Sequence, residues 1–203
     1  MLDRSLFFTE EQVDELGEAF NISLGASSST VYMTLGRQVN ITAPDVQVSS
    51  RVDFELPSND YMMAIEVNYI EGLYGKNVLL LKKEDVRKML EIMMMMEIEP
   101  ETFEIDEIGE SAMSELMNQM MGAAATGMSR FFDMVVNIST PTVIRIENME
   151  VFKQSYFKDE DVLVTARFGF EVADTFNSDF LNIMSLNFAE EMLSHVQKLK
   201  DRQ

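Results

Sequence analysis

The amino-acid sequence predicts an α+β fold in which two similar halves share one antiparallel sheet. The stretch from Asp14 to Pro44 returns from Ser111 to Pro141 with no residue gained or lost, since both ends are displaced by 97 positions (111 − 14 and 141 − 44). In each copy a helical pattern precedes runs typical of strands. A chain of 203 residues that is 46% hydrophobic can bury one sizeable core. Two repeats around a continuous sheet, with helices on both faces and a pseudo-two-fold axis, satisfy these observations.

The first long helix is predicted from its ends and from its apolar spacing. Thr9 followed by Gln12 is typical of a capping box, and Glu10 and Glu11 suit the first turn of a helix. Gly36 is typical of the left-handed residue that follows a helix. Between these ends, apolar residues recur at helical spacing: Val13, Leu16, Phe20 and Leu24.

The remaining elements follow in a similar order in each half. The first half predicts strands at Val39–Val46, Tyr61–Ile70 and Val78–Lys82, a turn at Gly72–Asn77 and a helix at Lys83–Met96. The second half predicts a helix at Ile105–Asp133, strands at Val135–Ile146, Met149–Ser155, Val162–Val172 and Phe180–Asn187, a turn at Asp174–Asp179 and a helix at Phe188–Arg202. We therefore expect one domain over residues 1–203, built of repeats at about 9–96 and 105–202, with a linker at about 97–104.

A polar stripe marks the long helix of each copy. Asp14, Glu18 and Asn21 are four and three residues apart, so they lie within about 60° of one another on a helix that turns about 100° per residue. One such stripe is typical of a solvated helix face. Its return in the same register, while neighbouring surface positions differ, favours a functional site. The candidate residues are Asp14, Glu18, Asn21 and Pro44 in the first copy and Ser111, Glu115, Asn118 and Pro141 in the second.

Three other features are assigned structural roles. The small-residue runs that begin at Gly25 and Gly122 lie inside helical patterns and lack the lysine of a phosphate-binding loop, so they favour tight helix packing. His195 lies near the cationic end of the last helix and is predicted to be a surface residue without a catalytic role. The cluster Met93–Met96 is more typical of core packing than of a ligand groove, with a partner-binding surface as the alternative.

Charge and composition exclude several classes of function. A formal net charge of −19 repels phosphate backbones and anionic lipid headgroups, so we expect neither nucleic-acid binding nor binding to a membrane surface. We also expect no membrane insertion, because the longest apolar run near the middle, Met89–Met96, is interrupted by Glu91 and too short to span a bilayer. The chain has no Cys and one His, which removes disulfides, Cys-based zinc sites and His-activated nucleophiles. No cluster has metal-ligand spacing. We expect a cytoplasmic protein with no cofactor or metal of its own.

The double motif resembles the CheC/CheX/FliY phosphatases of bacterial chemotaxis. Both copies contain the family pattern, which is Asp or Ser, three residues, Glu, two residues, Asn, twenty-two residues and Pro. The resemblance extends from about Thr9 to about Asn187. Around Asn21–Gly25 and Met117–Thr126 the chain is most similar to the flagellar motor-switch members of the family.

The resemblance implies a substrate and a division of roles. The substrate would be phosphorylated CheY, a response regulator that carries an aspartyl phosphate. Asn21 and Asn118 would each orient a water for attack on phosphorus, and Glu18 and Glu115 would each hold a lysine of the regulator. An acyl phosphate is already activated and the regulator's own Mg²⁺ carries charge, so the phosphatase mainly has to position a nucleophile. This would take place at or near the cytoplasmic face of the flagellar motor, with switch proteins as further partners.

The sequence departs from the family in two ways, and it allows one function other than a phosphatase. Phe20 precedes Asn21 where relatives often carry Gly. Flagellar members usually continue into a C-terminal domain that joins the motor ring, and the sequence up to Gln203 contains no such domain. We therefore expect either part of a flagellar member or a free-standing CheC-type protein. The rival function is a non-catalytic adaptor that binds the regulator or motor proteins without turnover.

Overall fold

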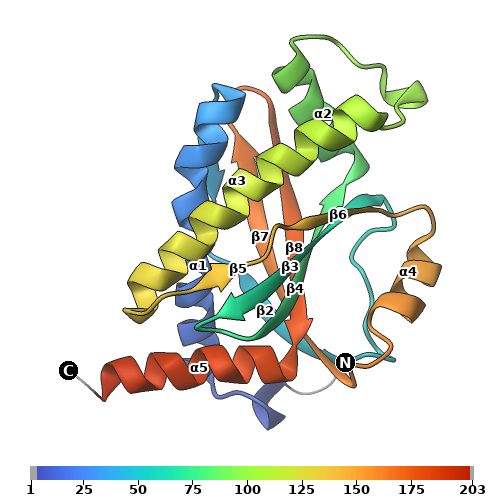
Figure 1. Ribbon diagram of the computed structural model, residues 1–203. Helices are drawn as coiled ribbons and strands as arrows, with labels where there is room; N and C mark the ends of the chain where they lie inside the picture. The colour runs from blue at the N-terminus through green and yellow to red at the C-terminus, as the bar shows by residue number, and fades with distance from the viewer. Residues whose placement is uncertain (1–3, 202–203) are drawn as a thin grey trace.

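A computed structural model describes residues 4–201 of the chain (Figure 1). Its helices are α1 (Glu10–Leu35), α2 (Lys83–Met94), α3 (Glu107–Phe132), α4 (Met149–Tyr156) and α5 (Leu186–Lys200), with short 3₁₀ turns η1 (Arg4–Leu6) and η2 (Pro100–Thr102). Its strands are β1 (Val39–Ile41), β2 (Asp45–Ser50), β3 (Tyr61–Glu71), β4 (Gly75–Lys82), β5 (Asn137–Ile138), β6 (Thr142–Arg145), β7 (Val162–Val172) and β8 (Phe176–Ser185). The predicted α+β class is confirmed.

The eight strands form one antiparallel sheet whose order is symmetric about its centre. The order is β1-β7-β8-β4-β3-β5, with β2 also paired to β7 and β6 also paired to β3. β4 and β8 pair at the centre. The short strands of each half lie against the long strand of the other half, β1 and β2 on β7 and β5 and β6 on β3. The two halves therefore interlock across the pseudo-two-fold axis.

Equivalent backbone hydrogen bonds repeat this symmetry in detail. The Thr42 N–H donates to the Gly169 carbonyl at 3.0 Å, and the Ser139 N–H donates to the Asn68 carbonyl at 2.9 Å. Thr42 and Ser139 are displaced by the same 97 positions as the motif (139 − 42). The segment before each motif proline is thus tied to the opposite half in the same way.

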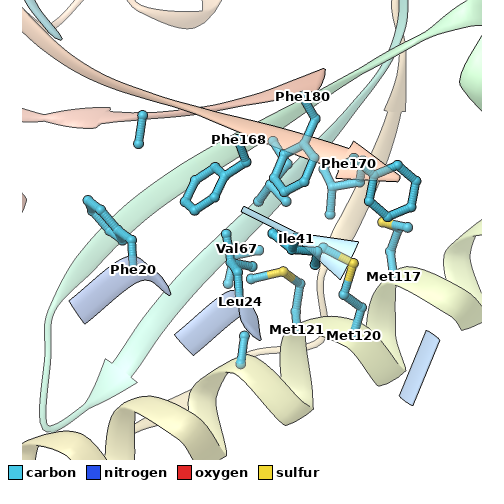
Figure 2. Close-up of a cluster of buried hydrophobic side chains, with 14 of the residues drawn as sticks. Phe20, Leu24, Ile41, Val67, Met117, Met120, Met121, Phe168, Phe170 and Phe180 are labelled. Atoms are coloured by element: carbon cyan, nitrogen blue, oxygen red, sulfur yellow. The ribbon is translucent and has the colours of Figure 1, made fainter. Parts of the chain in front are cut away.

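Helices cover both faces of the sheet, as predicted. The larger core lies between the sheet and α1, α2, α3 and α5. Figure 2 shows its centre, where side chains from α1, α3 and the strands meet: Phe20, Leu24, Ile41, Val67, Met117, Met120, Met121, Phe168, Phe170 and Phe180. On the opposite face, α4 and the segment before β3 form a smaller core in which Phe54 and Phe157 are in edge-on ring contact. In Figure 1, α4 lies apart from α1 and α3.

α1 and α3 pack closely because small residues meet where they touch. The Ser23 hydroxyl donates to the Ala124 carbonyl at 3.1 Å, although these residues belong to different halves. A Cβ atom placed on Gly127 would lie 2.9 Å from the Ala26 Cβ and 3.1 Å from the Ile22 carbonyl oxygen, so only glycine allows this approach. The predicted tight packing of the small-residue runs is confirmed at these positions.

The prediction is wrong for the two glycines that open these runs. A Cβ atom placed on Gly25 or on Gly122 would meet nothing within 4 Å beyond the adjacent residues and the backbone of its own helix. Both glycines have ordinary helical backbone rather than positive φ. Neither the helix contact nor the backbone conformation explains why glycine stands there.

Several predicted strands differ in the structure. Met149–Ser155 is not a strand but lies in α4, because Asn148 caps the helix by accepting from the Val151 N–H at 3.1 Å and the apolar residues fall at helical spacing. The continuous strands Val39–Val46 and Val135–Ile146 are each interrupted before the motif proline, which has no N–H to donate to a ladder. Phe180–Asn187 runs on into α5, which begins at Leu186.

Within residues 4–201, every helix is too short or too polar to cross a membrane.

The predicted linker, residues 97–104, contains η2 and the buried side chain of Phe103. Arg87 on α2 donates to the carbonyl of Ile98 at 2.7 Å and holds this segment against the domain. Arg202, which the predicted last helix includes, lies outside the described residues.

Candidate functional site

The two motif helices are fixed at their first turns by side-chain caps. In α1, the Gln12 N–H donates to the Thr9 hydroxyl at 3.2 Å and the Thr9 N–H donates to the Gln12 side chain at 2.9 Å, which confirms the predicted capping box. In α3, Asp106 accepts from the Gly109 N–H at 2.8 Å. The candidate residues follow within the next three turns, so each polar stripe extends from a capped helix start.

The first copy of the motif lines a shallow hollow between α1 and the segment that leads into β2. Asp14, Glu18 and Asn21 are exposed on α1, and Pro44 forms part of the facing wall. The hollow has a volume of about 400 Å³. Its lining residues are Glu10, Val13, Asp14, Gly17, Glu18, Asn21, Ala43, Pro44, Asp45 and Val46. We call it the first hollow.

The second copy lines an equivalent hollow between α3 and the segment that leads into β6. Ser111, Glu115 and Asn118 are exposed on α3, and Pro141 stands opposite them. The volume is about 520 Å³. The lining residues of this second hollow are Glu107, Glu110, Ser111, Ser114, Glu115, Asn118, Thr140 and Pro141.

Every residue of the second hollow has a counterpart in the first. Each residue that lines the second hollow is displaced by 97 positions from a residue that lines the first, for example Asn118 from Asn21 (118 − 21) and Pro141 from Pro44 (141 − 44). Chain geometry therefore brings together all four candidate residues of each copy, and it keeps the two sets apart on separate helices. The predicted exposure of both Glu and Asn pairs is confirmed.

The lining residues that sequence reasoning missed include the acidic residue that begins each motif helix. Glu10 and Glu107 are the first residues of α1 and α3, and both line their hollow. The sequence assigns Glu10 only the role of an acidic first-turn residue that suits the helix dipole, and it assigns Glu107 no role. The signal that could have found them is the repeat itself, because they share the 97-residue displacement of the motif (107 − 10).

Both hollows are acidic. No Lys, Arg or His is among the residues that line either hollow. Glu10, Asp14, Glu18 and Asp45 line the first, and Glu107, Glu110 and Glu115 line the second. A cationic group from a partner would be attracted to either position, whereas a free anion would be repelled.

The two motif glutamates differ in their hydrogen bonds. Gln119 donates to the Glu115 carboxylate at 2.7 Å, and the side-chain oxygen of Gln119 accepts from the Thr34 hydroxyl at 3.1 Å. Glu18 has no hydrogen bond or ion pair to the chain between residues 4 and 201. The residue that corresponds to Gln119 in the first copy is Ile22, which cannot donate to a carboxylate.

The other features singled out in the sequence lie away from the hollows. His195 is not a fully exposed surface residue but is partly buried against the Phe132 ring at 5.9 Å. Burial and the nearby Lys198 lower its pKa. Met93 and Met94 pack on the core as predicted, whereas Met95 and Met96 are exposed.

Over residues 4–201, His, Asp and Glu side chains form no group of three or more suited to a metal ion. The expectation that this chain carries no metal of its own stays a prediction.

Comparison with known proteins identifies relatives that match nearly the full length of the chain. A sequence profile described as the CheC-like family matches residues 108–145, which include the second motif. The chain is 33% identical over 186 residues to the flagellar motor switch phosphatase FliY of Bacillus subtilis (strain 168), covering 92% of this chain and 49% of that protein. The chain thus spans about half the length of this curated relative.

Solved structures also match this chain over most of its length. The X-ray crystal structure of Thermotoga maritima FliY matches with a TM-score of 0.83 and 34% identity, over 94% of this chain and 98% of that one. The FliM middle domain from H. pylori matches with a TM-score of 0.67 over 93% of this chain and 99% of that one. Its identity is 17%, so this second match shows a shared fold alone.

Proposed function

Since this chain belongs to the CheC-like family, with a FliY structure matched over nearly its full length, we propose that it hydrolyses the aspartyl phosphate of the response regulator CheY at two sites. The observation that carries the proposal is the pair of corresponding hollows. Each presents an exposed Glu and Asn one helical turn apart, opposite a proline. Two such surfaces within one fold suit repeated engagement of the same kind of partner.

Asn21 and Asn118 are assigned to the water. Each amide holds a water in line with the phosphorus of a regulator docked on its hollow. The water oxygen forms a bond to phosphorus, the bond between phosphorus and the aspartate oxygen breaks, and the water proton passes to a phosphate oxygen or to solvent. The products are inorganic phosphate and the free aspartate carboxylate. Positioning suffices because an acyl phosphate is already activated and its transition state is loose.

Glu18 and Glu115 are assigned to docking. Each carboxylate accepts charge-assisted hydrogen bonds from a lysine of the regulator. The acidic surroundings of both hollows support this role, because they favour a cationic group. The regulator's own Mg²⁺ would supply the charge that stabilises the departing carboxylate, and we expect this chain to contribute no ligand to that ion.

The proposed place of action is the cytoplasmic side of the flagellar motor. The support is that the relative from Bacillus subtilis is a flagellar motor switch phosphatase. Flagellar switch proteins are proposed as further partners.

Phosphate release from phosphorylated regulator tests the proposal. We expect the parent chain to accelerate release, and the double variant Asn21→Ala with Asn118→Ala to lose on the order of 100-fold in single-turnover rate while still binding. Asn187→Ala, an exposed asparagine on α5 outside both hollows, is the matched control and should keep the parent rate. Parent-like turnover by the double variant would contradict the assigned mechanism. Binding without turnover by the parent itself would favour the adaptor.

A further inference from the structure

We infer that Gly25 and Gly122 are positioning residues, which keep the helix surface beside Asn21 and Asn118 low enough for the phosphorylated regulator to reach each asparagine. The inference rests on the proposed function and deepens it. Its starting point is that both glycines stand where the fold itself gives no reason for glycine.

The fold does not require glycine at either position. A Cβ atom on Gly25 or Gly122 would meet nothing within 4 Å beyond adjacent residues and its own helix backbone, and neither glycine has positive φ. Gly127 is different, because a Cβ atom there would lie 2.9 Å from the Ala26 Cβ. Glycine inside a helix is unfavourable relative to alanine. A cost that the folded chain does not explain, and that occurs twice, points to something outside the chain.

The repeat separates these two glycines from the others in the motif helices. Gly25 and Gly122 correspond to each other, displaced by the motif's 97 positions (122 − 25). Gly17, which also has open space around it, corresponds to Ser114, so a side chain is accepted at that position in the second copy. Gly127 corresponds to Thr30. Only the glycine that follows the asparagine by four residues is kept in both copies.

The position of each glycine explains its use. On a helix, a residue four positions after another lies on the same face and about 6 Å further along the axis. Gly25 therefore continues the stripe of Glu18 and Asn21, and Gly122 continues that of Glu115 and Asn118. Asparagine has a short side chain, so a water held by its amide can reach a phosphorus atom only if the partner surface comes close to the helix. A Cβ atom one turn from the asparagine would extend the helix surface by about 1.5 Å, the length of one C–C bond, and would keep the partner surface further from the asparagine.

This inference predicts effects of opposite sign on stability and on activity. Replacement of both glycines by alanine or leucine removes an unfavourable helix residue without creating a contact, so we expect the Tm to rise, by roughly 3–8 °C for the double alanine variant. The rate of phosphate release should fall, by on the order of tenfold for alanine and more for leucine, since small displacements of a reacting group are costly.

The decisive experiment uses each glycine as the control for the other. In the Asn118→Ala background only the first site works, and there Gly25→Leu should lower the single-turnover rate at least tenfold more than Gly122→Leu does. In the Asn21→Ala background the order should reverse. Gly25→Ala and Gly122→Ala, which add the least bulk, repeat the comparison if a leucine variant fails to fold.

The outcomes separate this inference from the proposed function. Equal effects of the two glycine substitutions in both backgrounds, or a fall in Tm that accompanies the loss of rate, would overturn the inference and leave the phosphatase assignment standing. A parent chain that binds phosphorylated regulator without accelerating phosphate release would overturn the proposed function, and this inference with it. Crossed rate losses together with a raised Tm would support both.

Discussion

The first and second hollows present the same Glu and Asn pair in different surroundings. In the second hollow, Gln119 donates to Glu115 and links it to Thr34 on the other motif helix. In the first, Ile22 takes the place of Gln119, and Glu18 has no partner within residues 4–201. The pair therefore keeps its exposure and spacing without a supporting side chain. What differs is the restraint on the carboxylate, since a hydrogen bond from Gln119 holds Glu115 and no equivalent bond holds Glu18 within residues 4–201.

The charged residues around the pair also differ. The first hollow has Asp14 where the second has Ser111, and the second has Glu110 where the first has Val13. A carboxylate is thus gained at one position and lost at another. Both hollows stay acidic although individual positions change, which indicates that the negative potential matters more than the placement of each charge.

The largest effect on binding is expected from removing the shared carboxylates. Glu18→Ala with Glu115→Ala should weaken association with phosphorylated regulator by about 10- to 100-fold, because a partner lysine loses charge-assisted hydrogen bonds worth about 1.5–3 kcal/mol. A binding isotherm measures this, with Glu190→Ala on α5, an exposed residue outside both hollows, as the control. Unchanged affinity in the double variant would mean that these glutamates do not dock the regulator.

The contact between the motif helices gives a prediction about stability. Gly127→Ala should lower the free energy of unfolding by about 1–3 kcal/mol, because the added methyl group meets Ala26 and the Ile22 carbonyl oxygen. Thr30, its counterpart in the first copy, carries a full side chain, so Thr30→Ala should cost less. Chemical denaturation of the two variants measures the difference. Equal stability would show that the two helices can separate slightly without loss.

The ends of the motif helices and the composition of the site could be predicted from sequence because they depend on local signals. Thr9 with Gln12 and Gly36 act through bonds to residues within one helical turn. The stripe of Glu18 and Asn21 follows from helix periodicity alone. A fixed displacement between two copies also needs no knowledge of the fold.

The exchange of short strands between the halves could not be predicted in this way. Periodicity shows that β1 is a strand but does not say which strand it joins, and β1 in fact pairs with β7 of the other half. The α4 segment was ambiguous because a short apolar run fits a strand or a helix equally well. The bond between Thr34 and Gln119 joins residues of two separate helices, and no local pattern encodes it.

Substitution of Gln119 tests whether its hydrogen bond to Glu115 affects the rate at the second hollow. In the Asn21→Ala background, Gln119→Ile should slow phosphate release about 2- to 10-fold, which corresponds to one hydrogen bond of about 0.5–1.5 kcal/mol. Ile22→Gln in the Asn118→Ala background is the converse variant and should give a smaller gain. Thr34 on α1 supports Gln119, but its counterpart on α3 is Phe131 (131 − 34 = 97), which cannot donate a hydrogen bond to a glutamine at position 22. A faster second site after Gln119→Ile would mean that the glutamine competes with the regulator's lysine.

The smallest effect, and the most direct measure of the difference between the hollows, is expected from the single asparagine variants. If two sites act independently, either variant keeps the other site, so each should retain about half of the parent rate even though its own site loses on the order of 100-fold. The restraint on Glu115 reduces the freedom that must be lost when a partner binds, which favours the second site. Asn118→Ala should therefore retain somewhat less than half of the rate, and Asn21→Ala somewhat more. Single-turnover rates at saturating protein measure both, and the two losses should add up to the loss in the double variant. A single variant as inactive as the double one would show that the sites are coupled or that only one of them works.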